Sequence, residues 1–252
     1  YIWYQKGYFS WCLLPLSWIV EWEVKRRQQS APAKGSTPDD TLVVVVGGVT
    51  VGGTGKTPVL MSLAKFFLDL GYRVGVISRG YRGSYQKSPH MVEPEDPHCL
   101  SGDEPLLVRR SLNIPVVVFA DRRKALQHLI AHNNLDIVLS DDGLQHYNLP
   151  RDIEIAVLDF HRGLGNRRLL PAGPLREPAD RLDQVDWVLE RNSPDEHRGF
   201  FYQLNGFRNL VSGERLDPAQ AQVQWKEIPA VAIAGIGQPE QFFDMLRARG
   251  FR

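Results

Sequence analysis

The residues with the clearest chemical potential in this chain are the glycines and the Lys-Thr pair of segment 47–57, Gly-Gly-Val-Thr-Val-Gly-Gly-Thr-Gly-Lys-Thr. Glycines let a loop curl so that successive backbone N–H groups point at polyphosphate oxygens, and the positive end of a following helix strengthens this attraction. In such a loop Lys56 would neutralise the β- and γ-phosphates of a nucleotide, and the Thr57 hydroxyl would bind Mg²⁺. The general pattern has glycine where Thr50 stands. The segment predicts a phosphate-binding loop, and the alternative is a glycine-rich turn with a chance Gly-Lys-Thr.

A pair of carboxylates, Asp141 and Asp142, follows the strand-like run 136–140. At the carboxyl end of a strand beside a phosphate loop, one carboxylate can meet the metal ion held by Thr57 and the other can serve the reacting phosphate. Taken alone, Asp-Asp-Gly is more often a simple turn, but together with the loop the metal interpretation is the stronger one. His146 follows closely and could be a ligand, although a lone histidine is more often a hydrogen-bonded structural residue.

A third candidate is the proline-rich segment 169–178, Leu-Leu-Pro-Ala-Gly-Pro-Leu-Arg-Glu-Pro. So rigid a loop with two charges is rarely a mere spacer. Arg176 could approach phosphate oxygens as a planar fork. The alternative is a structural loop in which Arg176 and Glu177 pair with each other.

The elements that would position these residues alternate between strand and helix. Four consecutive valines, 43–46, are typical of a buried parallel strand, and Lys56 opens a helical pattern. We expect strands at 43–46, 72–78, 116–119, 136–140, 153–158, 185–189 and 231–234, and helices at 56–69, 104–111 and 121–132. This order predicts an α/β fold: a parallel phosphate-loop (P-loop NTPase-type) sheet with helices on both faces, which binds ligands at the carboxyl ends of its strands.

The composition excludes some classes of protein. The chain has 252 residues, 43% of them hydrophobic, which is enough for one large or two modest cores. A net charge of +1, with dispersed basic residues, disfavours nucleic acid as a partner. Cys12 and Cys99 are too few for a disulfide framework and are expected to be free thiols. Because the chain starts at Tyr1 and stops in an unfinished βα unit, we expect it to be a fragment.

The first 27 residues contain four of the six tryptophans. On a helix Trp11, Trp18 and Trp22 fall within about 40° of one another, and Lys25-Arg26-Arg27 follows. The apolar run is too short to span a bilayer, but tryptophans and a basic end suit a helix lying in the membrane interface. The alternative is a helix packed on the protein's own core. We therefore expect a membrane-associated amphipathic helix at 1–30, a core domain at 31–225, and the start of a smaller α/β domain at 226–252.

Five segments, taken together in order, resemble the tetraacyldisaccharide 4′-kinase family: 49–58, 78–81, 102–105, 141–146 and 169–178. The resemblance implies a kinase that uses ATP and Mg²⁺ to phosphorylate the 4′-hydroxyl of a tetraacylated glucosamine disaccharide 1-phosphate, giving lipid IVA. It also implies a peripheral enzyme on the cytoplasmic face of a Gram-negative inner membrane, held there by its N-terminal helix. No protein partner is implied.

The resemblance also assigns roles to single residues. It implies that Asp103 is the catalytic base, paired with a histidine expected beyond residue 252. The alternative for Asp103 is that it caps a helix beginning at Glu104. The other implied roles are catalysis for Lys56, Asp141 and Arg176, nucleotide binding for Thr50, Gly52, Gly53, Thr54, Gly55, Lys56, Thr57 and Arg122, and metal binding for Thr57, Asp142 and Glu177.

Two other classes of protein share part of this pattern. Membrane-bound ATPase switches combine a similar loop with an amphipathic helix, but they place a lysine where Val51 stands. GTP-driven metallochaperones usually carry Asn-Lys-x-Asp to recognise guanine, and this tetrapeptide is missing from the sequence. A kinase moves phosphate from ATP to an acceptor, whereas either switch releases inorganic phosphate.

Overall fold

A computed structural model gives the structure of the chain and describes residues 3–4, 9–29, 41–80, 83, 87–225, 231–235 and 239–251. The chain forms two compact units, Tyr1–Gly199 and Phe200–Arg252. The first unit holds the large sheet up to its last strand, which begins at Gly199, and every residue singled out above as a candidate for chemistry.

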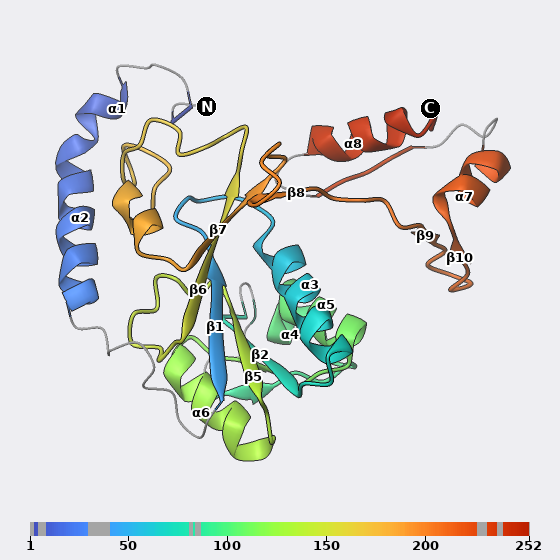
Figure 1. Cartoon of the computed structure of the whole chain (residues 1–252), viewed down its shortest axis with the longest axis horizontal. Coiled ribbons are helices and arrows are strands. Elements are labelled where there is room, and N and C mark those ends of the chain that lie inside the picture. Colours follow the sequence, from blue (N-terminus) through green and yellow to red (C-terminus); the bar gives the residue numbers. More distant parts are fainter. Residues whose placement is uncertain are drawn as a thin grey trace. The chain divides into compact units, whose positions relative to one another are not determined.

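The large sheet has eight strands in the order β3-β4-β2-β5-β1-β6-β7-β8 (Figure 1). Neighbouring strands from β4 to β7 are parallel, and β3 is paired antiparallel with β4. The valine run of β1 is at most 2% exposed, as a strand covered on both faces requires. The strand bounds are β1 Leu42–Gly47, β2 Val74–Ser78, β3 His90–Met91, β4 Val116–Val118, β5 Ile137–Asp141, β6 Ile153–Asp159, β7 Trp187–Arg191 and β8 Gly199–Phe200.

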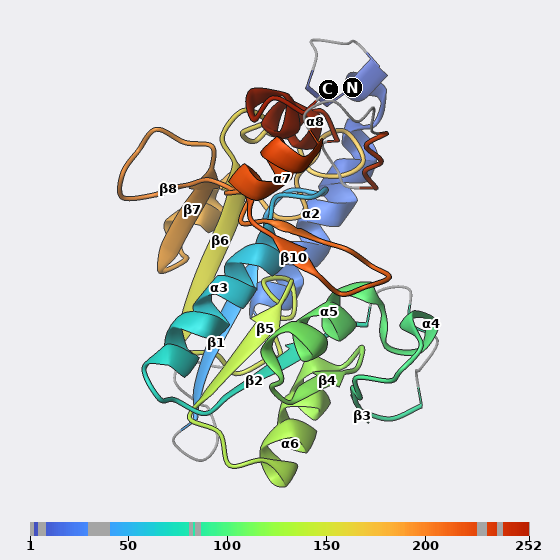
Figure 2. The same cartoon turned by 90° about the vertical axis from the view of Figure 1, so that its right-hand side faces the viewer.

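Helices cover both faces of this sheet. Figure 1 shows α3 (Lys56–Asp69) and α5 (Asp103–Leu112) on one side and α6 (Arg122–His132) and α2 (Leu14–Gln29) on the other. In Figure 2, turned by 90°, α3 lies over β1 and β5. The short α4 (His98–Ser101) precedes α5.

Each of these helices begins where the local sequence allows it. Asp121 caps α6 by accepting hydrogen bonds from the backbone N–H groups of Arg123 and Lys124, at 3.1 and 3.2 Å. Gly55, in the left-handed region at φ 98°, leads directly into α3. The first turn of α3 therefore starts at Lys56, as predicted.

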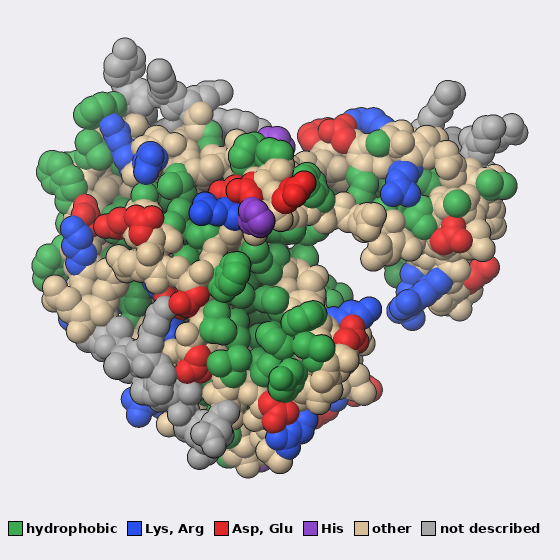
Figure 3. All heavy atoms as spheres, in the orientation of Figure 1, with side chains coloured by type: hydrophobic (Ala, Val, Ile, Leu, Met, Phe, Trp, Pro, Cys, Tyr) green, Lys and Arg blue, Asp and Glu red, His purple; other side chains and the backbone are tan. Residues whose placement is uncertain are grey.

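The N-terminal segment is helical, as predicted, but it is divided into α1 (Phe9–Cys12) and α2. Trp11, Trp18 and Trp22 are 60–64% exposed, so the interpretation that this stripe packs on the protein's own core is wrong. Figure 3 shows hydrophobic side chains protruding along the edge formed by α1 and α2. Within the described ranges, no helix is both long and apolar enough to cross a membrane.

The described residues of the second unit form a two-stranded sheet and two helices: β9 Phe207–Arg208, β10 Arg215–Leu216, α7 Pro218–Trp225 and α8 Pro239–Ala248. The prediction of a strand at 231–234 is wrong, because residues 231–235 form neither helix nor strand. The second compact unit begins at Phe200, well before the expected boundary at 226. The functional division of the chain at residues 30 and 225 remains a prediction.

Candidate active site

The site lies where the carboxyl ends of β1 and β5 meet. These strands are parallel neighbours in which Val46 pairs with Asp141, so the loop after β1 and the carboxylates after β5 leave the sheet side by side. The chain continues from β1 to β2 on one side, whereas β6 pairs with the other side of β1. Ligands of open parallel sheets bind at such a change of direction.

The glycine loop 47–55 has the backbone geometry of a phosphate cradle. Gly52 has φ 111° and Gly55 has φ 98°, a region that side chains strongly disfavour. Thr54 is 4% exposed, and its hydroxyl oxygen has no hydrogen-bond partner among the residues described. Thr50, at the position where related loops often have glycine, forms an isolated bridge with Leu175. The threonine thus ties the loop to segment 169–178.

Three charged side chains gather beside this loop. The Arg176 guanidinium donates two hydrogen bonds to the Asp142 carboxylate, at 2.8 and 2.7 Å, and one to the carbonyl oxygen of Gly48, at 2.7 Å. The Lys56 ammonium lies 3.7 Å from the same carboxylate. Burial would raise the pKa of Asp142, but Arg176 and Lys56 outweigh it and hold this pKa below its ordinary value. The alternative that Arg176 pairs with Glu177 is therefore wrong.

Asp141 behaves differently from its neighbour. It is 5% exposed, and burial, with smaller contributions from Glu104 and Asp142, raises the pKa of Asp141 to about 7. One of its carboxylate oxygens has no hydrogen-bond partner among the described residues. Arg122, 2% exposed, donates to the Asp141 backbone carbonyl at 3.2 Å, and burial lowers the pKa of Arg122 to about 10. Asp141 and Arg122, both predicted as site residues, thus lie side by side in the buried part of the site.

Asp103 is exposed at the first position of α5, and the cap residue is Gly102, with φ 90°. The helix begins one residue earlier than predicted, and no side chain caps it. The interpretation that Asp103 is an N-cap is therefore wrong. The charge of Glu104 contributes to the raised pKa of Asp141, so this helix start faces the same site.

Glu177 lies apart from the cluster of Lys56, Asp142 and Arg176. It is fully buried, and its carboxylate accepts hydrogen bonds from Gln145, Tyr147 and Arg181. In the described part of the chain, no group of three or more histidine, cysteine or acidic side chains is arranged to hold a metal ion. Metal binding by Glu177, Asp142 and Thr57 remains a prediction, and for Glu177 these three donors favour a structural role.

Comparison with known proteins identifies the chain. Residues 9–252 match the family model described as tetraacyldisaccharide-1-P 4′-kinase. The tetraacyldisaccharide 4′-kinase of Ectopseudomonas mendocina is 42% identical and aligns over 99% of this chain and 76% of its own length. That of Nitrosococcus oceani is 45% identical over 98% of this chain and 72% of its own length. The chain belongs to the tetraacyldisaccharide 4′-kinase family.

A solved structure supports the same conclusion. The crystal structure of the apo form of LpxK from Aquifex aeolicus in complex with ATP has a TM-score of 0.75 and 26% identity, and the match covers 97% of this chain and 79% of that one. The predicted family, α/β fold and enzyme class are confirmed. The chain is a kinase that acts on an alcohol group.

Sequence reasoning missed several residues around the candidate site. Gln145 donates to the Gly48 carbonyl oxygen at 3.1 Å and also to Glu177, so it connects the phosphate loop with the buried carboxylate. Tyr147 bonds the same carboxylate. Exposed Arg79 lies close enough for its charge to lower the pKa of Arg122 and of His146. In the sequence, the only indication of their importance is that they lie within or next to the segments that resemble the kinase family.

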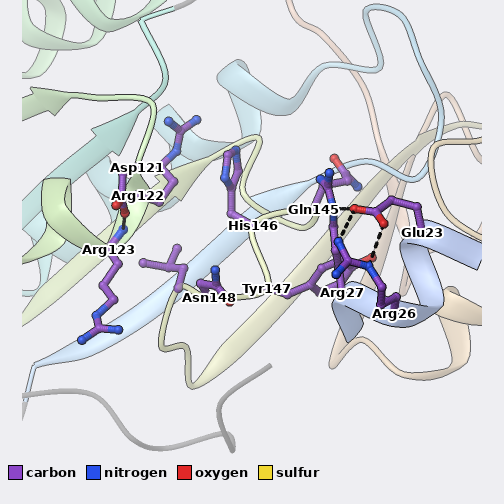
Figure 4. Close-up of a pocket in the computed structure, with 11 residues that line it drawn as sticks. Glu23, Arg26, Arg27, Asp121, Arg122, Arg123, Gln145, His146, Tyr147 and Asn148 are labelled. Carbon is purple, nitrogen blue, oxygen red and sulfur yellow. Dashed lines mark hydrogen bonds and ion pairs between the residues drawn. The ribbon is translucent and has the colours of Figure 1, made fainter. Parts of the chain in front are cut away.

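A cavity of about 430 Å³ adjoins this site. Figure 4 shows side chains of α2 on one side, side chains at the start of α6 on the other, and His146 between them. Burial, helped by Arg122 and Arg79, lowers the pKa of His146 to about 4, so its ring is neutral at pH 7. The lining residues are Glu23, Arg26, Arg27, Asp121, Arg122, Arg123, Gln145, His146, Tyr147, Asn148 and Leu149.

Proposed function

We propose that the chain transfers the γ-phosphate of ATP, with Mg²⁺, to the 4′-hydroxyl of a tetraacyldisaccharide 1-phosphate, giving lipid IVA in lipid A biosynthesis. The observation that carries the proposal is the cluster of Lys56, Arg176 and Asp142 at the mouth of the glycine loop. Family membership and the ATP bound to the Aquifex aeolicus relative support it.

The described side chains fit a nucleotide and its metal ion. Buried polar atoms without a hydrogen-bond partner among the described residues are rare unless a ligand meets them. Four such atoms belong to site residues: the Thr54 hydroxyl oxygen, one Asp141 carboxylate oxygen, and the Nε of Arg122 and of Arg176. The site thus combines unsatisfied hydrogen-bond donors on two arginines with an unsatisfied acceptor on a carboxylate. Phosphate oxygens and a hard cation are ligands that such a set would satisfy.

The protein's own groups would divide the work as follows. The backbone of residues 52–55 and the ammonium of Lys56 hold the phosphate chain, and the Thr57 hydroxyl and Asp142 hold Mg²⁺. When bound, Mg²⁺ supplies positive charge that stabilises the transferring phosphate. Arg176 adds a planar guanidinium at the same place. Because Gly48 and Asp142 already orient it, Arg176 acts without reorganisation.

Asp103 would accept the proton of the 4′-hydroxyl. A sugar hydroxyl is a poor nucleophile at neutral pH, and a positioned base typically contributes about two to four powers of ten in rate. Asp103 is exposed and stands at the start of a helix whose next residue, Glu104, contributes to the raised pKa of Asp141. Asp141 is too deeply buried to reach an incoming acceptor, so its part is to orient groups of the site.

The cavity beside the site suits an acceptor that carries a phosphate of its own. Four arginines line it: Arg26, Arg27, Arg122 and Arg123. Arg122 also binds the Asp141 carbonyl, so one side chain touches both the cavity wall and the phosphate site. Replacing Arg123 by alanine should raise the KM for the glycolipid about tenfold and leave the KM for ATP unchanged. An unchanged glycolipid KM would place the acceptor elsewhere.

The exposed tryptophans suit a peripheral enzyme of the membrane interface. Trp11, Trp18 and Trp22 project from the segment that ends in Lys25-Arg26-Arg27, and basic ends are attracted to anionic lipid. The proposed location is the cytoplasmic face of the inner membrane, where ATP is present. The glycolipid is the partner we propose, with no role for nucleic acid or for a protein partner.

Product analysis tests the function. The chain is incubated with Mg²⁺, ATP labelled at the γ-phosphate and tetraacyldisaccharide 1-phosphate dispersed in lipid. The proposal expects the label in the lipid and a mass increase of one phosphate in the acceptor. Release of the label only as inorganic phosphate would contradict it and favour an ATPase switch.

A further inference from the structure

The segment Arg168–Glu177 is joined to the N-terminal helix at one end and to the phosphate loop at the other. Its helix end contacts residues about 150 positions earlier in the sequence, and its other end carries Arg176. In Figure 1 the loop region before η1 (Ala179–Asp183) runs beside α2. We call this segment the strut.

Ser17 makes the buried connection between α2 and the strut. Its hydroxyl donates to the carbonyl oxygen of Leu169 at 2.9 Å and accepts from the backbone N–H of Ala172 at 3.1 Å. Ser17 is 4% exposed, whereas its neighbour Trp18 is 63% exposed. The helix therefore turns a small polar side chain toward the protein and its large apolar side chains away. Trp3 adds a hydrogen bond from its indole N–H to the Pro171 carbonyl oxygen, at 3.0 Å.

The other end of the strut holds the phosphate loop by its backbone. The Pro174 carbonyl oxygen accepts from the Val51 N–H at 2.9 Å, and the Arg176 N–H donates to the Val49 carbonyl oxygen at 2.7 Å. The Arg176 guanidinium holds Gly48 as well. Three positions of the loop are thus set by the strut.

The strut is stiff between its two ends. Three internal backbone hydrogen bonds fold it on itself, from Gly173 to Leu169, from Leu170 to Leu175 and from Leu175 to Arg168, at 2.8–3.1 Å. Ala172 and Leu175 are fully buried. Because a close-packed segment moves as a unit, a displacement at the Ser17 end is transmitted to the loop end.

A second route links the same helix to the same loop. Gln28, at the end of α2, donates to the Tyr147 hydroxyl at 3.4 Å, and Tyr147 donates to Glu177. Gln145 joins Glu177 to the Gly48 carbonyl oxygen. Both routes from α2 therefore end at Gly48.

We infer that helix α2 is part of the scaffold of the phosphate loop, and that Ser17 is a positioning residue that sets the loop for nucleotide through the strut. The inference rests on the proposed function in one respect, that this loop binds ATP. The N-terminal helix then serves the site even where no membrane is present. Its outer face meets lipid, and its inner face supports the loop.

The test compares ATP affinity among variants of the full chain by titration calorimetry without lipid. Ser17→Ala removes only the hydroxyl, and with it both hydrogen bonds to the strut, and should weaken ATP binding roughly three- to thirtyfold, the range of coupling through packed networks. Trp3→Phe, which keeps an aromatic ring but loses the indole N–H and its bond to Pro171, should weaken it in the same direction by less. Ser17→Thr keeps the hydroxyl and should restore most of the affinity. Gln29→Ala, exposed on the same helix, is the matched control and should bind ATP normally.

The outcomes separate a positioning role of Ser17 from a merely structural one. Thermal melting shows whether each variant is folded at the temperature of the titration, and Trp3→Phe carries the test if Ser17→Ala is unfolded. Folded variants with lowered melting temperature but unchanged ATP affinity would overturn the inference, because Ser17 would then be merely structural. If the unaltered chain binds no ATP, the proposed function itself falls, and the inference with it.

Discussion

Asp103 is the residue whose proposed role depends most on the start of one helix. Gly102 occupies the cap position of α5 and Asp103 the first helical position, so asparagine at 103 removes neither a cap bond nor a buried contact. We expect Asp103→Asn to keep the melting temperature and the affinity for Mg-ATP. Lipid phosphorylation should fall at least about a hundredfold, because asparagine cannot accept a proton. Steady-state rates with melting curves check this, and normal turnover would mean that the base lies elsewhere.

His146 gives a prediction about acid stability. Burial lowers its pKa from 6.5 to about 4 in the folded chain, so the unfolded chain takes up a proton first as the pH falls. The stability tied to the neutral ring is complete above pH 6.5 and is lost as the pH falls toward 4. Glutamine cannot be protonated, so His146→Gln should lose about 1 to 2 kcal/mol less stability than the unaltered chain between pH 7 and pH 5.

Urea unfolding at both pH values measures this difference. His197→Gln, which changes an exposed histidine, is the control and should behave as the unaltered chain does. Equal losses of stability in all three proteins would show that burial of His146 does not control the loss of stability at low pH.

At the residue scale, the sequence was informative where residues lie in a local motif, as Lys56 does. Gln145 could not be assigned, because its bond to Gly48 joins residues 97 positions apart.

At the scale of elements, α1 and α2 yield the clearest prediction. The rings of Trp11, Trp18 and Trp22 are largely exposed, so replacing all three by serine should hardly change the melting temperature. The same change removes the apolar anchors and should weaken binding to anionic vesicles by at least about a hundredfold. Vesicle co-sedimentation measures this, with Trp187→Ser as control, because that ring is 61% exposed on β7.

If the triple variant stays bound to vesicles, the helix is not the membrane contact. The sequence predicted this helix and its tryptophan stripe from spacing, but spacing left open whether the stripe faces a membrane or the protein's own core. It could not predict the role of the opposite, polar face, because Ser17 acts through a hydrogen bond to Leu169, which lies 152 positions away. Nor could it place the first turn of α5, where Gly102 rather than an acidic side chain ends the preceding loop.

At the scale of the whole chain, the sheet was predictable and the second unit was not. Runs such as 43–46 and 137–139 signal buried parallel strands by composition, and the glycine loop marks the start of α3. In the second unit, 231–235 has strand-like composition but no partner strand among the residues that the structure describes, and Val231 and Ile233 are 90% and 87% exposed. A strand needs neighbours to satisfy its backbone, and composition alone does not supply them.

Lys56 offers the most direct test of the central claim, that the loop after β1 holds the phosphate being transferred. The measurement is the rate of phosphate transfer from ATP to tetraacyldisaccharide 1-phosphate by Lys56→Ala, with Lys65→Ala, exposed on the same helix, as the control. The ion pair that Lys56 makes is with the partly exposed Asp142, so the variant should fold normally by melting and circular dichroism. We predict a rate at least about a hundredfold below that of the unaltered chain, with Lys65→Ala unaffected. Near-normal transfer by a folded Lys56→Ala protein would contradict the account.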